Sequence, residues 1–231
     1  MSAKPPTLWR ATLAILAKDL KLEMRSFETL TVTLIFTTAT FVVFHFAFDR
    51  DQLFGSIAAG VFWVTILFAS ALTINRLLSN ERSQGGYEAL LLAPIDRNAI
   101  LLAKIKFTFI ALAVLELFAV LVFGLLLLGP NFDSSMLALI PVCLLANLGI
   151  ATIGTLVSAL ATDTSARELL VPLMTLPLFT PLLIGAARAT APLFAATPHV
   201  VDLGKWLALM GLYDAVFLML AYAVFDYIVE D

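Results

Sequence analysis

The sequence predicts an all-α integral membrane protein with one N-terminal interfacial helix and six transmembrane helices. First, 61% of the 231 residues are hydrophobic and only 13% are charged, whereas soluble domains are about half apolar and about a quarter charged. Second, six apolar stretches are each long enough to cross roughly 30 Å of hydrocarbon as a helix. The predicted spans cover residues 29–48, 54–75, 107–128, 136–161, 169–187 and 203–225.

Residues 1–28 precede the first span and contain an amphipathic pattern. Apolar side chains recur at helical spacing from Leu8 and Trp9 to Met24, among charged residues of both signs. This pattern is typical of a helix that lies along the inner leaflet. A soluble tail is the alternative, although a tail would not need Trp9 and leucines on one side. Because these charges do not form a short basic leader, we expect no cleaved signal peptide.

The connections between the spans are too short for a second domain, so residues 1–231 are predicted to form a single transmembrane domain. If the N-terminus is cytoplasmic, eleven of the 14 Lys and Arg residues lie on the inner side, and only Arg50, Arg188 and Lys205 lie outside. Basic residues are enriched in cytoplasmic loops of membrane proteins. We therefore expect both termini in the cytoplasm.

The fifth span carries Pro172, Pro177 and Pro181 at successive turns. Each proline removes a backbone donor, so this span is predicted to be kinked or broken. Such helices are tolerated where neighbouring helices cover the freed carbonyl groups, and they also occur in moving parts. The three prolines are therefore gating candidates, with a packing role as the alternative.

The cytoplasmic connection, residues 76–106, contains a short amphipathic segment between two helix breakers. The pair Gly85-Gly86 is expected to end the helix that leaves the second span, and Pro94 closes the segment that follows. A short helix of this kind suits insertion into a groove on another protein, but it could also rest on lipid headgroups. Its apolar face is formed by Tyr87, Leu90 and Leu91, and its polar side carries Glu81 and Glu88.

Nine residues of this connection form a recognisable pattern: Glu81, Arg82, Gly85, Gly86, Glu88, Leu90, Leu91, Pro94 and Lys104. The pattern resembles the loop that ABC exporter permeases of the ABC-2 type offer to their ATPase. More narrowly, GVFWVTILFASALTINRLL at 60–78 and YEALLLAP at 87–94 resemble the haem exporter protein B (CcmB) family of bacterial cytochrome c maturation. That family usually shows an acidic pair and a single glycine, where this chain has Ser83, Gln84, Gly85 and Gly86.

The resemblance implies an ABC-2-type exporter permease in haem export and c-type cytochrome maturation. Its ATP would be hydrolysed by a separate subunit, to drive haem translocation or release of a haem-loaded chaperone. The implied partners are two copies of a cytoplasmic ABC ATPase, a second copy of this chain, a haem-handling membrane subunit, a small membrane anchor and the haem chaperone. The implied location is the bacterial inner membrane. ATPase coupling is expected at Glu81, Arg82, Gly85, Gly86, Tyr87, Glu88, Leu90, Leu91 and Pro94.

No catalytic motif is visible in the sequence. There is no GxxxxGK[ST] phosphate loop, and the only Gly-Lys pair, Gly204-Lys205, is followed by Trp206 at the predicted outer face. No cluster of nucleophile, base or metal ligands is apparent. We therefore expect a non-catalytic subunit with no metal, no directly bound cofactor and no nucleic-acid partner, and with haem only as a handled species.

Two carboxyl groups are candidates for a substrate path, because charged groups inside a membrane are costly and are usually functional. Glu116 lies near the middle of the third span and Asp214 near the middle of the sixth. Each could take up a proton or pair with a polar group such as Asn147. Ala113 and Ala119 lie on the same helical face as Glu116, which favours close packing and a structural role.

His45, His199 and Trp63 complete the substrate-path candidates. Both histidines are expected at the outer side, and histidine is a common haem ligand. Trp63, like Trp206, Tyr213 and Phe194, could touch a porphyrin, but aromatic residues at the membrane interface are the ordinary explanation. Two other functions stay open: an ABC-2 permease for another amphiphile such as a drug, lipid or polysaccharide, and an ion-coupled carrier that uses Glu116 and Asp214.

Overall fold

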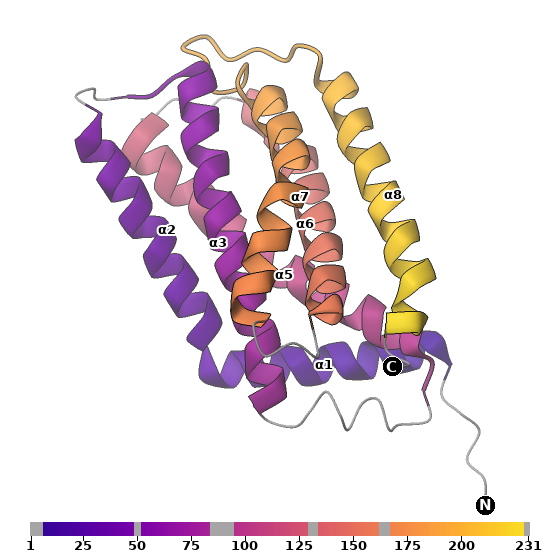
Figure 1. Cartoon of the computed structure of the whole chain (residues 1–231). Helices are drawn as coiled ribbons and strands as arrows, with labels where there is room; N and C mark the ends of the chain where they lie inside the picture. The colour runs from indigo at the N-terminus through magenta and orange to yellow at the C-terminus, as the bar shows by residue number, and fades with distance from the viewer. Residues whose placement is uncertain (1–6, 49–51, 84–94, 129–133, 162–166, 229–231) are drawn as a thin grey trace, which may run out of the picture.

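The computed structural model describes residues 7–48, 52–83, 95–128, 134–161 and 167–228. Within these ranges the chain is all-helical, which confirms the predicted fold class (Figure 1). The α-helices are α1 (Leu8–Ser26), α2 (Glu28–Ala47), α3 (Gly55–Ser83), α5 (Arg97–Phe123), α6 (Leu139–Leu160), α7 (Arg167–Thr190) and α8 (Leu203–Ile228). A π-helical turn, η1 (Gly124–Leu128), follows α5, and a 3-10 turn, η2 (Ser134–Ala138), precedes α6.

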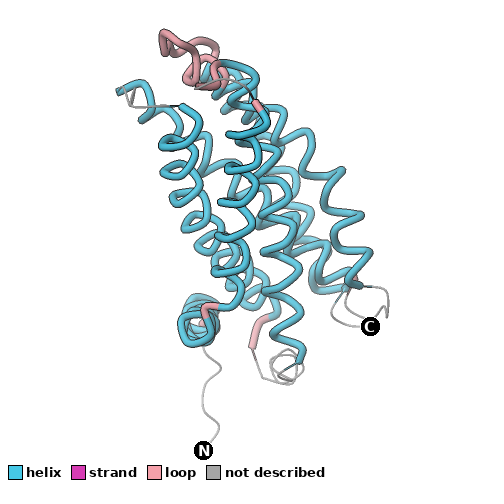
Figure 2. Tube along the Cα trace, turned by 90° about the vertical axis from the view of Figure 1, so that its left-hand side faces the viewer, coloured by secondary structure: helices cyan, strands magenta, loops and turns pink. Residues whose placement is uncertain are grey.

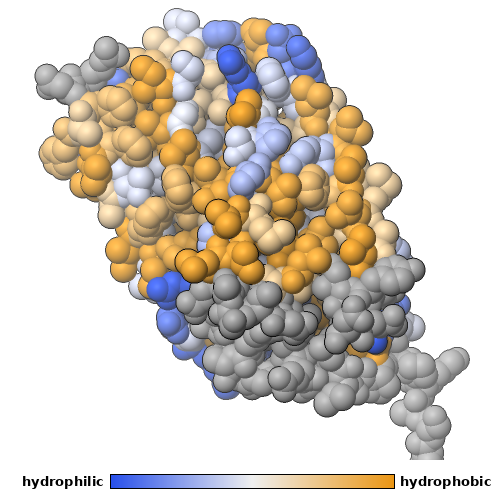
Figure 3. Space-filling model, viewed as in Figure 1, coloured by the Kyte–Doolittle hydropathy of each residue, from blue (hydrophilic) through white to orange (hydrophobic). Residues whose placement is uncertain are grey.

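Six helical segments are long and apolar enough to cross a membrane, and each overlaps one predicted span. They are Glu28–Ala47, Gly55–Arg76, Arg97–Leu128, Met136–Leu160, Leu169–Thr190 and Leu203–Phe225. These helices run side by side, while α1 lies across one end of the bundle and is seen almost end-on in Figure 2. Hydrophobic side chains dominate the middle of the face in Figure 3. We call the two ends of the bundle the α1 end and the far end.

α3 continues beyond the second predicted span to Ser83, in agreement with a helix that ends at Gly85-Gly86. α5 begins at Arg97, ten residues before the predicted third span, so it extends further at the α1 end than the sequence predicted. The early start of α5 has a local cause, because the Asp96 side chain accepts a hydrogen bond from the Asn98 backbone N–H at 2.9 Å and caps the helix. Ile100, directly behind this cap, is buried.

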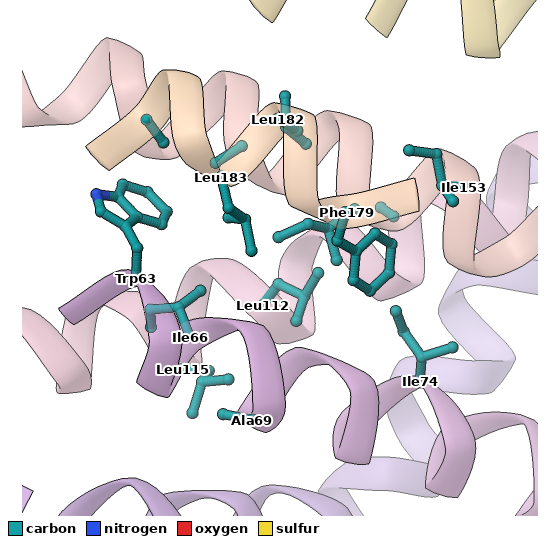
Figure 4. Close-up of a cluster of buried hydrophobic side chains, with 14 of the residues drawn as sticks. Trp63, Ile66, Ala69, Ile74, Leu112, Leu115, Ile153, Phe179, Leu182 and Leu183 are labelled. Atoms are coloured by element: carbon teal, nitrogen blue, oxygen red, sulfur yellow. The ribbon is translucent and has the colours of Figure 1, made fainter. Parts of the chain in front are cut away.

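The core lies between α3, α5, α6 and α7. In the central window of α3, 67% of the residues are buried, against 17% in α2 and in α8. α3 is therefore the central helix, and α2 and α8 lie at the periphery of the bundle. The core cluster in Figure 4 consists of Trp63, Ile66, Ala69 and Ile74 of α3, Leu112 and Leu115 of α5, Ile153 of α6, and Phe179, Leu182 and Leu183 of α7.

α7 is continuous through its three prolines, so the break considered at Pro172, Pro177 and Pro181 is not present. A proline in a helix loosens the backbone hydrogen bonds to the carbonyl groups about one turn before it. Leu178 lies three residues before Pro181, and the Tyr213 hydroxyl of α8 donates a hydrogen bond to its carbonyl at 2.7 Å. α8 is thus hydrogen-bonded to the proline-rich part of α7.

Candidate functional site

α1 and α5 are joined by a buried ion pair. The Nζ of Lys104 lies 2.7 Å from Oδ2 of Asp19, and the two side chains are 7% and 5% exposed. Lys18 approaches the other carboxylate oxygen at 3.0 Å from a more exposed position. This ion pair was not predicted from the sequence. The helical pattern of the N-terminal segment did not distinguish Asp19 from its charged neighbours, and Lys104 lies 85 residues away from Asp19 along the chain.

Further contacts extend this junction along α5. The Nζ of Lys106 lies 3.5 Å from the centroid of the Trp9 ring, in a cation–π arrangement. The Thr12 hydroxyl, which lies 2.9 Å from the Leu8 carbonyl within α1, also approaches the Ala99 carbonyl at 3.4 Å. Leu16 and Leu20 of α1 pack against an apolar pair of α5, Phe107 and Ala111. The α1–α5 junction therefore covers the stretch of α5 from residue 99 to residue 111.

Glu116 is paired in the middle of the bundle with Asn147, the polar partner that the sequence offered as one alternative. Its Oε2 accepts a hydrogen bond of 2.8 Å from Nδ2 of Asn147 on α6, and the residue is only 3% exposed. The Cys143 thiol lies beside the same carboxyl group. Among the residues that the structure describes, Oε1 of Glu116 and Oδ1 of Asn147 have no hydrogen-bond partner. The Glu116–Asn147 pair thus fixes α5 to α6 inside the membrane region.

Asp214 is equally buried but has a different environment. It projects from α8 against Gly149 of α6, where an added Cβ would overlap both Asp214 Oδ1 and Leu182 Cδ2. No hydrogen-bond partner for either carboxylate oxygen is found in the described part of the chain. Asn147 and Gly149 are two residues apart, or about 200° around a helix. Glu116 and Asp214 therefore approach α6 from different sides.

Four phenyl rings close the bundle at the far end. Phe62 of α3 and Phe123 of α5 contact Phe194, which lies in the connection between α7 and α8, and Phe41 of α2 packs against Phe62 and Phe123. The ring centroids of Phe123 lie 5.2 Å from those of Phe41 and Phe62 and 5.6 Å from that of Phe194. The connection is held by the Gly55 N–H, which donates to the Phe194 carbonyl at 2.7 Å.

Each remaining substrate-path candidate forms a hydrogen bond within the bundle or within the connection between α7 and α8. Trp63 is 2% exposed and donates its indole N–H to Thr190 Oγ1 of α7 at 2.9 Å, so it is not a membrane-interface side chain. Phe194 is not one either, because it is buried in the phenyl cluster. His45 donates through Nδ1 to the Leu126 carbonyl at 2.7 Å, and the exposed His199 donates through Nδ1 to Thr197 at 2.9 Å.

Each of these two hydrogen bonds requires a proton on Nδ1, so the neutral form of each ring carries its lone pair on Nε2. No group of three or more His, Cys, Asp or Glu side chains that could hold a metal ion occurs within the described ranges.

The predicted coupling segment lies mostly outside the described residues. Glu81 and Arg82 belong to the last helical residues of α3, although their side chains are not described. Gly85, Gly86, Tyr87, Glu88, Leu90, Leu91 and Pro94 fall outside the described ranges. The structure does describe what brackets this segment: the end of α3 on one side and, on the other, the part of α5 that α1 holds.

Comparison with known proteins identifies similar chains. A family model described as CcmB protein matches residues 10–228. A protein named Heme exporter protein B from Rhodobacter capsulatus is 28% identical over 176 residues, which cover 76% of this chain and 80% of the relative. Its namesake from Pseudomonas aeruginosa is 29% identical over 209 residues, covering 84% and 88%. The Escherichia coli protein of the same name is 38% identical over 56 residues, 24% of this chain and 26% of the relative.

Proposed function

The chain belongs to the CcmB protein family, and we propose that it is the permease subunit of an ABC transporter complex in haem export and c-type cytochrome maturation. The observation on which this proposal chiefly rests is the family match, which extends over nearly the whole chain. The six membrane-spanning helices and the crosswise α1 are compatible with a permease. The name Heme exporter protein B of the relatives suggests haem as the handled species.

The energy source in this proposal is a cytoplasmic ABC ATPase, present in two copies beneath two copies of this chain. Hydrolysis of ATP would act on residues 81–94 and, through them, on the bundle. A haem-handling membrane subunit, a small membrane anchor and the haem chaperone would complete the assembly. The prolines of α7, two of which, Pro177 and Pro181, are exposed, would allow that helix to bend during the cycle.

The α1 end is proposed to face the cytoplasm of a bacterium, with the spans in its inner membrane. This orientation is supported by the excess of Lys and Arg on the segments at the α1 end. α1 and the last turns of α8 lie at the same end of the bundle, as six crossings require, so both termini are proposed to face the same side (Figure 1).

The experiment targets the apolar face of the coupling segment. Tyr87→Asp combined with Leu90→Asp should weaken binding of the ATPase by several-fold or more, because buried apolar anchors contribute on the order of 1 to 4 kcal/mol each to an interface. Copurification of the ATPase with the membrane-inserted variant measures this effect. Thr164→Asp, in the other cytoplasmic connection, is the matched control. An ATPase that stays bound at full stoichiometry with coupled hydrolysis would overturn the coupling assignment.

An ion-coupled carrier is a second candidate function, favoured by one observation. Asp214 is a buried carboxyl with no hydrogen-bond partner among the described residues, and buried carboxyl groups inside membrane proteins often form proton relays. Transport that persists without the ATPase, follows a proton gradient and is lost in Asp214→Asn would establish this function. Transport that requires ATP in both the unmodified chain and the variant would exclude it.

A further inference from the structure

We infer that Asp19 is a positioning residue for coupling: through Lys104 it fixes α1 to the first turns of α5, so that both helices move as one body. This inference rests on the proposed function, in which an ATPase acts on the segment just before α5. It extends the coupling apparatus to α1, which the sequence identified only as a helix lying on the membrane.

The first support is the quality of the ion pair. Asp19 and Lys104 meet at 2.7 Å with both side chains almost completely buried. Nearby, the pair formed by Glu28 and Arg76 has a separation of 3.7 Å, with side chains 61% and 36% exposed. Exposed pairs contribute little to holding two elements together, whereas removing one partner of a buried pair is strongly destabilising. The Asp19–Lys104 pair therefore fixes the two helices far more firmly than a surface pair does.

The second support is the extent of the α1–α5 junction. Trp9 contacts Lys106 at one position and Thr12 contacts Ala99 at another, and the apolar contacts to Phe107 and Ala111 lie beyond them. Contacts spread over more than three helical turns prevent α1 from pivoting about a single point. α1 and the start of α5 therefore move together.

The third support is the stiffness and reach of α5. Its 27 residues, Arg97–Phe123, contain no glycine or proline, and such a helix is about 40 Å long. Lys104 lies near one end of it, and Phe123 at the other end is a member of the far-end phenyl cluster with Phe194. A displacement of the α1–α5 junction would thus reach the cluster that closes the far end. α7, with its three prolines, is the more compliant neighbour.

The test uses the assembled complex in lipid nanodiscs. Asp19→Asn and the double variant Asp19→Asn/Lys104→Gln are compared with the unmodified chain, and Glu28→Gln, at the exposed pair, is the matched control. The double variant removes both charges of the pair together, so it should fold even where the single variant does not. We expect both to bind the ATPase at full stoichiometry, with ATP turnover at least several-fold lower, and the double variant to be no worse than the single. Asp19→Glu should restore part of the turnover.

A distance measurement separates positioning from simple stabilisation. Spin labels are placed at Ala17 on α1 and Val114 on α5, in a Cys143→Ala background. With Asp19 and Lys104 intact, the distance between the two labels within one copy should be the same with and without an ATP analogue. In Asp19→Asn this distance should broaden or shift when the analogue binds.

Two outcomes would overturn the inference: a label distance that changes with nucleotide in the unmodified chain, or a folded double variant with normal turnover. Failure of the proposed function gives a different result, since the ATPase would then not copurify even with the unmodified chain.

Discussion

Replacing Gly149 by alanine should loosen the contact between α6 and α8. Side chains from two other helices fill the space beside the Gly149 Cα, where any other residue would carry its Cβ. A methyl group there would overlap Oδ1 of Asp214 from α8 and Cδ2 of Leu182 from α7. Both neighbours are almost fully buried, so neither can move aside into solvent. The substitution therefore forces the three helices apart or their side chains into unfavourable rotamers.

The expected cost follows from measured overpacking of protein cores. Inserting a methylene-sized group into a well-packed site costs about 1 to 3 kcal/mol, which is roughly a 5- to 140-fold change in the unfolding equilibrium constant. Gly211 in α8 provides the matched control, because an added Cβ there has no atom within 4 Å. Gly211→Ala should be neutral or stabilise the chain by up to about 1 kcal/mol, since alanine is the better helix former.

The assay is equilibrium unfolding in mixed micelles, followed by tryptophan fluorescence, for which the buried Trp63 is a suitable probe. A double-mutant cycle with Asp214→Ala checks the cause. Removing the carboxyl group relieves one of the two overlaps, so the combined variant should be more stable than the sum of the single effects predicts. If Gly149→Ala unfolds at the same midpoint as Gly211→Ala, the close approach of α6 and α8 is refuted.

Three further predictions concern the buried pair, the prolines and the topology. Asn147→Leu should destabilise the chain by about 1 to 3 kcal/mol in the same titration, because Glu116 loses its donor, whereas Glu116→Gln keeps an acceptor and should cost less; equal effects would show that the hydrogen bond is not what matters. Pro177→Ala should raise the unfolding temperature and lower ATP turnover in the assembled complex, and unchanged turnover would return the prolines to a packing role. In a Cys143→Ala background, Thr197→Cys should react with an impermeant maleimide in intact cells and Lys21→Cys should not; the reverse pattern would invert the proposed orientation.

The sequence predicted the membrane-spanning elements well, because twenty or so apolar residues in succession have few other stable arrangements. It offered the pairing of Glu116 with Asn147 as one of two alternatives, the other being protonation, since a carboxyl group in hydrocarbon is costly without a polar partner. The start of α5 was placed too late. Residues 97–106 contain Arg97, Lys104 and Lys106, and these charges hid an apolar helical stretch that α1 covers.

Contacts between distant segments could not be predicted from patterns along the chain. Asp19 and Lys104 are 85 residues apart, and neither differs in type from the exposed charges around it. Phe41, Phe62, Phe123 and Phe194 come from four separate elements, each in a stretch where phenylalanine is unremarkable in a membrane. The burial of Trp63 could have been predicted from one feature of the sequence: this residue lies in the middle of a predicted span, not at its edge.

The hydrogen bond between Glu116 and Asn147 also sets a condition on biosynthesis. Asn147 is made 31 residues after Glu116, which at about 5 to 20 residues per second is roughly 2 to 6 s later. During that interval the carboxyl group of the third span has no partner from the fourth, and an acidic residue at the centre of a lone helix disfavours membrane insertion by a few kcal/mol. The hydrogen bond from Asn147 therefore removes a cost that the third span bears alone until the fourth span has been made.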